Sequence, residues 1–401
     1  MEIIKTQIGI IGAGPAGLLL GQMLYNRGID SVILESRDRN YVRARLRAGV
    51  QENETMNIFI EEGVGEKLRQ ERVIHRGMYL HSNNERHYIN CEELTGGKIV
   101  GAYGQRNITC DMIDIREAHG LPLYFEAKAE KIDHIKQKQL EIGFTHQGQQ
   151  KRVQCDFVAG CDGFHGISRN HIPKKTVKIF EKNYPYAWFG ILAEAPPASH
   201  ENIYAHSEFG FALQSMRGTN RSRLYLQVPE DEDIHRWSDR EFFDEFERRI
   251  GAGYVVNRGD IIDKSLAHMR GFVCETMRYG NMFLAGDAAH IVPPTGAKGM
   301  NLAVADVKVL GEGLKLHYDK NDDYLLDHYT EICLQRVWKV ERFSWWFTTT
   351  THTFPNQSAF DYKMQAATLR YIIDSEVGSH SVAENYVGLP FENKFLDYII
   401  G

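Results

Sequence analysis

The chain of 401 residues lacks the features that mark several specialised classes of protein. Its six cysteines are scattered and include no Cys-x-x-Cys pair, so we expect neither a disulfide framework nor a metal site, and a reducing cytoplasm is the default location. No apolar run approaches the ~18 to 20 residues that a membrane span needs. An apolar run follows Lys5, but glycines interrupt it, so we expect no signal peptide.

A strong excess of one charge is also missing. The formal net charge of −6 gives no electrostatic reason to expect a nucleic acid or an anionic membrane as a partner. No internal repeat or low-complexity linker divides the chain. The length allows two domains or one large α/β domain with an insertion, and 43% hydrophobic with 25% charged residues is ordinary for a globular protein.

What the chain does have begins with a βαβ pattern at the N-terminus. Residues 8–11 form an apolar run typical of a buried strand, and residues 16–26 have a helical pattern that ends at Gly28. A second apolar run at residues 31–35 predicts the next strand. The three segments together predict a βαβ unit.

A glycine motif, Gly12-x-Gly14-x-x-Gly17, lies between the first strand and the helix. Gly12 permits a tight turn, Gly14 lets the backbone approach a pyrophosphate, and Gly17 allows close packing of helix on strand. Glu35 ends the second strand, where its carboxylate can accept hydrogen bonds from a ribose diol. The motif predicts a dinucleotide site but does not separate NAD from FAD.

Two later motifs favour a flavin. Cys161-Asp162-Gly163 follows the apolar residues 157–160, and Gly286-Asp287 ends a strand that begins at Met282. An aspartate at the carboxyl end of a strand can bind a ribityl hydroxyl, with simple helix capping as the alternative role of Asp287. The backbone amides of residues 296–299 begin the next helix and suit the negative charge of a reduced isoalloxazine.

The remaining segments predict an insertion between two parts of one nucleotide-binding fold. Residues 184–228 alternate apolar and polar side chains, as in an antiparallel sheet, and helical patterns dominate from about residue 325. We therefore expect an α/β fold with an α+β insertion: a Rossmann-like FAD-binding domain, an inserted antiparallel-sheet substrate domain and C-terminal helices. The expected domains are residues 1–180 with 270–345, residues 181–269 with part of 75–100, and residues 346–401.

These motifs, in this order, resemble the class A flavoprotein monooxygenases, which are FAD-dependent aromatic hydroxylases. The resemblance runs from Gln7 to Pro390 and is greatest to members that act on 4-hydroxybenzoate. It implies noncovalent FAD, a reduced nicotinamide donor, O2 and a homodimer, with oxygen transfer from a flavin C4a-hydroperoxide to carbon 3 of the ring. The strings that carry it are Arg45-Leu-Arg-Ala-Gly49, Tyr103-Gly-Gln105, residues 160–169, residues 285–299 and residues 383–390.

The resemblance also assigns cofactor contacts beyond the three glycines. His165 and Arg270 would take part in binding the nicotinamide dinucleotide. Arg37 and Arg39 follow Glu35 and favour NADPH, because they can receive a 2′-phosphate, while NADH or dual use stays open. The implied FAD contacts are Glu35, Arg45, Arg47, Gln105, Asp287, Gly299, Met300 and Asn301.

Candidate substrate residues lie in the inserted sheet. A benzoate carboxylate needs a cation with forked donors and hydroxyl partners, and Arg217 with Ser215 and Tyr225 supplies that set. Ser215 and Arg217 are two residues apart, so on a strand their side chains share a face. The same holds for Arg223 and Tyr225.

Further residues follow from the resemblance and from the chemistry of a phenol. A phenol has a pKa of about 10 and its phenolate is the better nucleophile, so the site must favour ionisation. The resemblance gives Tyr204 the hydrogen bond to the 4-oxygen of the substrate, with Tyr386 next and His75 as the exit to solvent. Arg223 would be a positive charge near the flavin, and the Pro294 carbonyl would face the substrate hydroxyl; Asn301 is also expected among the catalytic residues.

Two places depart from the expected pattern, Asn202 and the residues 36–39 described above, and other functions stay open. Asn202 stands where the family has an aliphatic residue, and it would either accommodate another ring substituent or face solvent. The alternatives are a hydroxylase of 4-aminobenzoate or of a dihydroxybenzoate, and a flavin reductase or redox sensor that does not hydroxylate. Trp345 and Trp346 are expected in core packing or in a dimer interface.

Overall fold

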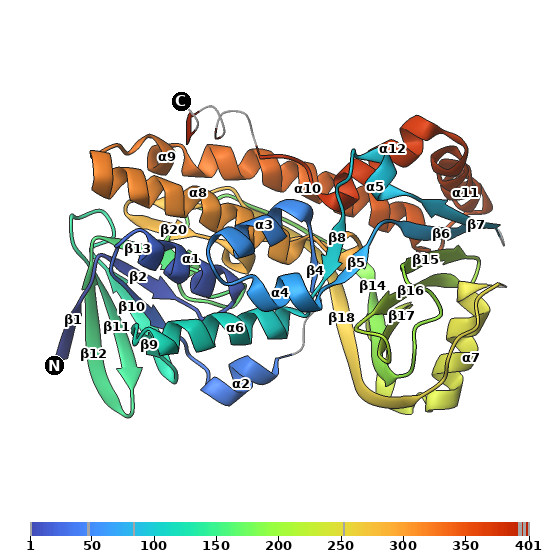
Figure 1. The fold of residues 1–401 in the computed structure, drawn as a ribbon, viewed down its shortest axis with the longest axis horizontal. Helices are drawn as coiled ribbons and strands as arrows, with labels where there is room; N and C mark the ends of the chain where they lie inside the picture. Colours follow the sequence, from blue (N-terminus) through green and yellow to red (C-terminus); the bar gives the residue numbers. More distant parts are fainter. Residues whose placement is uncertain are drawn as a thin grey trace.

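The computed structural model describes residues 2–45, 49–82, 85–251, 253–391, 395, 398 and 399. Two sheets on opposite sides of the molecule are joined by long helices along one edge and by a small sheet between them (Figure 1). Among the described residues, none of the helices has the length and apolar character needed to cross a bilayer.

A six-stranded sheet forms the nucleotide-binding side of the molecule. All neighbouring strands in it are parallel except the edge pair β19 and β20. The central strands are buried on both faces, which explains why they have continuous apolar sequences rather than alternating ones. In spatial order the strands are β19 (Arg278–Tyr279), β20 (Met282–Leu284), β13 (Phe157–Gly160), β2 (Ile8–Ile11), β3 (Ser31–Leu34) and β9 (Leu123–Tyr124).

Helices and a second sheet cover this central sheet. The predicted βαβ unit is confirmed, with α1 (Pro15–Asn26) between β2 and β3. A Cβ atom on Gly9 would lie 2.5 Å from Ile142 Cδ1, which shows how closely the second sheet packs on β2. The second sheet is β1 (Glu2–Lys5), β12 (Gln149–Cys155), β11 (Leu140–His146) and β10 (Ala127–Asp133), and α1 also packs against α6 (Gln105–Ala118) and α8 (Gly299–Lys320).

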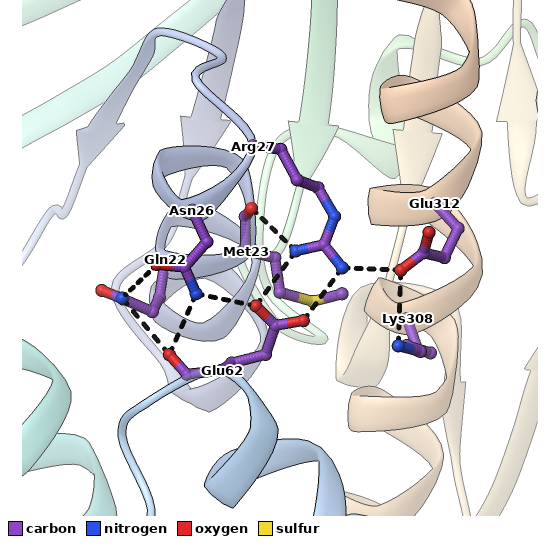
Figure 2. Close-up of polar contacts among 7 residues, drawn as sticks. All are labelled: Gln22, Met23, Asn26, Arg27, Glu62, Lys308 and Glu312. Carbon is purple, nitrogen blue, oxygen red and sulfur yellow. Dashed lines mark hydrogen bonds and ion pairs between the residues drawn. The ribbon is translucent and has the colours of Figure 1, made fainter. Parts of the chain in front are cut away.

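A buried ionic cluster holds α1 to its neighbours. The guanidinium of Arg27, just after α1, lies between Glu62 and Glu312, with nitrogen–oxygen distances of 2.9 and 2.6 Å (Figure 2). Glu62 follows α3 (Asn53–Glu61), and Glu312 belongs to α8. The cluster therefore ties the helix after the glycine turn to α8.

An eight-stranded sheet forms the other side and confirms the predicted insertion. Its neighbouring strands are antiparallel except β15 and β6, which run parallel. Strand β6 comes from an earlier part of the chain. Helix α7 (Asp239–Ile250) covers one face of this sheet. In order the strands are β21 (His290–Ile291), β18 (Asp260–Cys274), β14 (Ile179–Glu194), β17 (Ser222–Pro229), β16 (Gly210–Met216), β15 (Asn202–Ser207), β6 (Met78–Ser82) and β7 (Glu85–Ile89). The exact division into domains stays a prediction.

The remaining elements join the two sides. Along the upper edge of Figure 1, α8 and α10 (Tyr329–Thr351) run from the six-stranded sheet toward the eight-stranded one. Trp346 packs against a core cluster, while Trp345 is 43% exposed. A sheet of β4 (Val50–Gln51), β8 (Val100–Ala102) and β5 (Val73–His75) lies between the two sides. The other helices are α2 (Arg39–Ala44), α4 (Glu66–Glu71), α5 (Cys91–Leu94), α9 (Tyr324–Asp327), α11 (Ala359–Asp374) and α12 (Glu376–Val387).

Candidate active site

The glycine turn between β2 and α1 leaves open space at the N-terminus of α1, where a phosphate group could bind. A Cβ atom on Gly12 would lie 2.3 Å from the Cys161 carbonyl oxygen, and one on Gly17 would lie 2.0 Å from the Gly12 oxygen. A Cβ atom on Gly14 would meet nothing within 4 Å. Gly12 and Gly17 are therefore required by the packing of the turn, whereas Gly14 borders open space at the uncapped N-terminus of α1.

Glu35 is held rigidly beside this turn. Its carboxylate accepts hydrogen bonds from the backbone N–H of Ala13 at 2.8 Å and from that of Arg37 at 2.8 Å. The acceptor is thus fixed at the carboxyl end of β3, adjacent to the glycine turn. This arrangement suits a ribose diol, which offers two hydroxyl donors.

A second open edge lies where β20 ends and α8 begins. Asp287 is exposed and makes no hydrogen bond to the described residues, while the neighbouring Gly286 N–H donates to Asp306 at 2.9 Å. The imidazole of His290 also contacts Asp306, at 2.6 Å, so the turn before Asp287 is fixed from within the protein. Gly299 begins α8, and a Cβ atom there would meet nothing within 4 Å. The uncapped amides of α8 and the free Asp287 carboxylate fit the phosphate, ribityl and ring portions of FAD.

Asn301 has a structural role beside this edge. Its side-chain oxygen accepts from the Glu52 N–H at 2.9 Å, and its amide nitrogen donates to the Val50 carbonyl at 3.3 Å. It thereby holds the first turn of α8 against β4. Met300, the preceding residue, packs against the core of the nucleotide-binding side.

A buried ionic triad, which the sequence did not reveal, supports the same helix end. Lys298 Nζ lies 2.6 Å from Glu52 Oε1 and donates to the Tyr386 carbonyl at 3.0 Å. Arg336 binds the other Glu52 oxygen at 3.1 Å. Burial lowers the pKa of Lys298, and the Glu52 carboxylate opposes that shift. The partners lie 246 and 284 residues from Glu52, so only the folded chain brings them together.

The two residues predicted to bind the nicotinamide dinucleotide both contact one aromatic ring. The Arg270 guanidinium lies 4.6 Å from the centroid of Phe164, whose ring is 5.0 Å from that of His165. Gln105 begins α6, Arg45 follows α2, and Arg47 lies outside the described residues.

Four of the predicted substrate residues share one face of the eight-stranded sheet, and Arg217 directly follows the end of β16. Tyr204 pairs with Leu213, which pairs with Tyr225, and Ser215 pairs with Arg223 on the next strand. Since side chains alternate along a strand, this register places all of these side chains on the same face. A cavity of about 330 Å³ lies between this face and the three-stranded sheet, lined by Met216, Arg217, Arg223, Tyr225, Val73, Ala102, Tyr103 and Gly104 among others.

The two arginines of this face have different partners. Arg217 donates to the Ser215 hydroxyl at 3.0 Å and to the Met216 carbonyl at 2.9 Å, and no carboxylate among the described residues pairs with it. Arg223 donates to Asp263 at 2.6 Å and to Ser265 at 2.5 Å. Arg217 thus keeps charge for an anionic ligand, while Arg223 is anchored to β18. No sequence motif marks Asp263 and Ser265, so these two partners of Arg223 were not predicted.

Tyr204, Tyr386 and Asn202 form a buried polar group. The rings of Tyr204 and Tyr386 are 6.3 Å apart in an edge-to-face arrangement, and the Asn202 amide donates to the Tyr386 hydroxyl at 2.8 Å. Burial raises the pKa of both tyrosines, and the hydrogen bond from Tyr386 opposes this for Tyr204. Asn202 is only 2% exposed, so the alternative in which it faces solvent is wrong. Asn202 is two residues before Tyr204 on β15, so both side chains lie on the same face of the sheet.

His75 and Pro294 are each held by contacts of their own. His75 is buried, and its Nδ1 is 3.0 Å from a carboxylate oxygen of Glu201, a residue that sequence analysis missed. Glu201 immediately precedes β15. Only its position next to Asn202 could have suggested from the sequence that it belongs to this site. Pro294 lies in a short 3-10 turn, where its carbonyl accepts from the Ala297 N–H at 2.9 Å.

Comparisons with known proteins identify the family. A family model described as FAD binding domain matches residues 5–344. The chain is 45% identical over 401 residues to the p-hydroxybenzoate hydroxylase of Acinetobacter baylyi, covering 100% of this chain and 99% of that protein. It is 23% identical over 345 residues to a kynurenine 3-monooxygenase of Christiangramia forsetii, covering 82% and 76%.

Solved structures show the same fold at low sequence identity. The p-nitrophenol 4-monooxygenase PnpA of Pseudomonas putida DLL-E4 superposes with a TM-score of 0.82 at 17% identity, covering 97% of this chain and 100% of that one. The Diels-Alderase PyrE3 has a TM-score of 0.77 at 19% identity, covering 96% and 81%. Because the family model spans most of the sequence and the Acinetobacter relative aligns along its full length, the chain belongs to the FAD-binding family of aromatic-ring monooxygenases.

Proposed function

We propose that this protein hydroxylates 4-hydroxybenzoate at carbon 3, consuming O2 and a reduced nicotinamide and releasing 3,4-dihydroxybenzoate and water. The observation that carries the proposal is the sheet face on which Arg217 and Ser215 lie together with the buried phenol of Tyr204. A forked cation suits the carboxylate of a benzoate, and a buried hydroxyl suits an oxygen on the opposite side of its ring. The 45% identity to a p-hydroxybenzoate hydroxylase supports the same substrate.

Each side chain then has a role in binding or in proton movement. Arg217, with Ser215 and Tyr225, binds the carboxylate, and Tyr204 forms a hydrogen bond to the 4-oxygen. The phenolic proton leaves through Tyr386 toward His75, so that the ring reacts as its electron-rich phenolate. The phenolate directs oxygen to the carbon beside its own, which is carbon 3.

The cofactor contacts belong to the proposal as well. FAD, when bound, accepts hydride from the nicotinamide and supplies the activated oxygen. The glycine turn and Glu35 would hold its pyrophosphate and ribose, with Arg45, Arg47 and Gln105 as further contacts. Asp287 and the N-terminus of α8 would hold its ribityl chain and ring system.

We propose NADPH as the preferred donor and a homodimer as the assembly. Arg39 is already paired with Glu117 at 2.6 Å, whereas Arg37 has no carboxylate partner among the described residues and lies over Tyr41. Arg37 is therefore the side chain available for a 2′-phosphate. The exposed Trp345 and the 71% exposed Phe360 offer apolar surface for a second copy of the chain.

The test is to follow NADPH oxidation by the FAD-loaded protein with and without 4-hydroxybenzoate, and to identify the aromatic product by mass spectrometry. We expect strong stimulation, with 3,4-dihydroxybenzoate formed in step with NADPH consumed. Benzoate, which lacks the 4-hydroxyl, and 4-hydroxybenzamide, which lacks the carboxylate, are the matched controls and should give no hydroxylated product. Stimulation that yields only hydrogen peroxide would show that 4-hydroxybenzoate is a mimic and not the substrate.

A further inference from the structure

Asn202 is bonded to the tyrosine that lies next to Tyr204. Its side chain is buried on β15, and its Nδ2 donates to the Tyr386 hydroxyl at 2.8 Å. Its Oδ1 is buried and has no partner in the described part of the chain. An aliphatic side chain at this position would leave the Tyr386 oxygen without this donor, so the asparagine changes what Tyr386 can do.

The amide orientation follows from what each choice leaves unpaired. In the orientation observed, one N–H of Asn202 donates to Tyr386 and the carbonyl oxygen has no hydrogen-bond partner among the described residues. The reversed amide would leave both N–H groups without an acceptor in a buried site. Buried N–H groups are left unpaired more rarely than carbonyl oxygens, so donation to Tyr386 is the favoured state.

The bond from Asn202 sets a direction for the hydrogens beyond it. Because the Tyr386 oxygen accepts from Asn202, its own proton is free for the neighbouring Tyr204. The two rings meet edge to face at 6.3 Å, which brings the Tyr386 hydroxyl to the side of Tyr204. Donation in that direction agrees with the effect of the pair on pKa, which is lowered for Tyr204 and raised for Tyr386. The Tyr204 hydroxyl can in turn donate a hydrogen bond to the 4-oxygen of the bound substrate.

We infer that Asn202 is a positioning residue that directs a chain of donors, from its amide through Tyr386 and Tyr204, at the phenolic oxygen of the substrate. The inference rests on the proposed function and extends it. A chain of donors aimed at one oxygen stabilises the phenolate over the phenol, because each bond polarises the next. After the proton has left toward His75, Asn202 holds the chain in the orientation that favours the ionised ring.

The test is the pKa of bound 4-hydroxybenzoate, read from the phenolate-minus-phenol difference spectrum of the FAD-loaded enzyme titrated with pH. This measurement needs no turnover. Asn202→Leu keeps a side chain branched at Cγ and removes the donor, and we expect it to raise the pKa of the bound ligand by about 0.5 to 1 unit, the equivalent of one net hydrogen bond. The other groups that act on the two tyrosines, Cys91, Tyr225 and Arg217, are unchanged by the substitution.

A double-mutant cycle separates positioning through Tyr386 from a direct effect on the ligand. In the Tyr386→Phe background the chain is already cut, so Asn202→Leu should then shift the pKa by less than about 0.2 units. Three outcomes would each overturn the inference. They are an equal pKa shift in both backgrounds, no shift in the otherwise native enzyme, and a shift to lower pKa. Failure of the native enzyme to bind 4-hydroxybenzoate would instead overturn the proposed function, and this inference with it.

Discussion

The imidazole of His75 and the carboxylate of Glu201 lie 3.0 Å apart, and the histidine is fully buried. A second Glu201 oxygen accepts from the Arg76 N–H at 2.9 Å, so the carboxylate cannot rotate away without losing that bond. Glu201 accepts a hydrogen bond from Nδ1–H, which leaves Nε2 as the acceptor of the neutral ring. That Nε2 is buried without a partner among the described residues. Glu201 thus fixes the tautomer that can receive a proton from the substrate site.

Replacing Glu201 should therefore slow proton exit from the bound substrate. We expect Glu201→Ala to reduce, at least several-fold, the rate at which bound 4-hydroxybenzoate ionises after a rapid jump in pH, as followed by stopped-flow absorbance. Glu92→Ala is the matched control, because it removes a carboxylate that pairs with the exposed Arg76 side chain and leaves His75 untouched. Equal rates in both variants would remove Glu201 from the proton path.

Arg217 provides a test of carboxylate binding. In Arg217→Lys a single ammonium replaces two parallel donors, so we expect the dissociation constant of 4-hydroxybenzoate to rise about 10- to 150-fold, or about 1.5 to 3 kcal/mol. Binding of the neutral 4-hydroxybenzamide should change far less. The control is Arg221→Lys, an exposed arginine at the same cavity that already pairs with Glu194 at 3.1 Å. A similar loss in the two variants would indicate a general effect of charge and not a specific clamp.

The glycine turn separates cofactor binding from folding. Gly14 has a φ of −77°, which alanine adopts readily, and an added Cβ would meet no other described residue within 4 Å apart from its chain neighbours. Gly14→Ala should therefore change the free energy of unfolding of the apoprotein by no more than about 1 kcal/mol. It should still weaken FAD binding at least about tenfold, because the added methyl group occupies the space of the pyrophosphate.

Gly17→Ala gives the contrasting result. Its Cβ atom would lie 2.0 Å from a backbone oxygen, so the apoprotein itself should lose stability, by about 1 to 3 kcal/mol. Thermal unfolding of both apoproteins and fluorescence titration with FAD measure the two quantities. Normal FAD affinity in Gly14→Ala would place the cofactor away from this turn.

Local patterns in the sequence predicted the elements whose evidence is local. The glycine turn and βαβ unit are confirmed, and Arg217, two residues after Ser215, donates to the Ser215 hydroxyl at 3.0 Å. The missed contacts join distant segments: Glu52 meets Arg336 across 284 residues, and Asn202 meets Tyr386 across 184. Such pairs depend on how helices and sheets dock, and neither partner carries a mark of the other in its own neighbourhood.

A last prediction concerns acid stability and rests on His352, which is completely buried at the end of α10. Its Nδ1 contacts the Thr348 carbonyl at 2.9 Å, and its Nε2 accepts from the Trp188 indole at 2.7 Å. Both ring nitrogens thus have hydrogen-bond partners when the ring is neutral. A proton added to Nε2 would point at the indole N–H of Trp188, which is itself a donor. Burial lowers the pKa of His352 to about 3.

This lowered pKa links folding to pH with a definite sign. Below pH 6.5 the unfolded chain takes up a proton at this histidine that the folded chain refuses until about pH 3, so stability is lost as pH falls through that window. At pH 5 the loss from this one group is about 2 kcal/mol. His352→Gln cannot titrate, so its free energy of unfolding, measured with urea in excess FAD, should fall less between pH 7 and pH 5 than that of the native protein. Parallel pH profiles for the two proteins would mean that His352 is protonated in the fold, in conflict with its bond from Trp188.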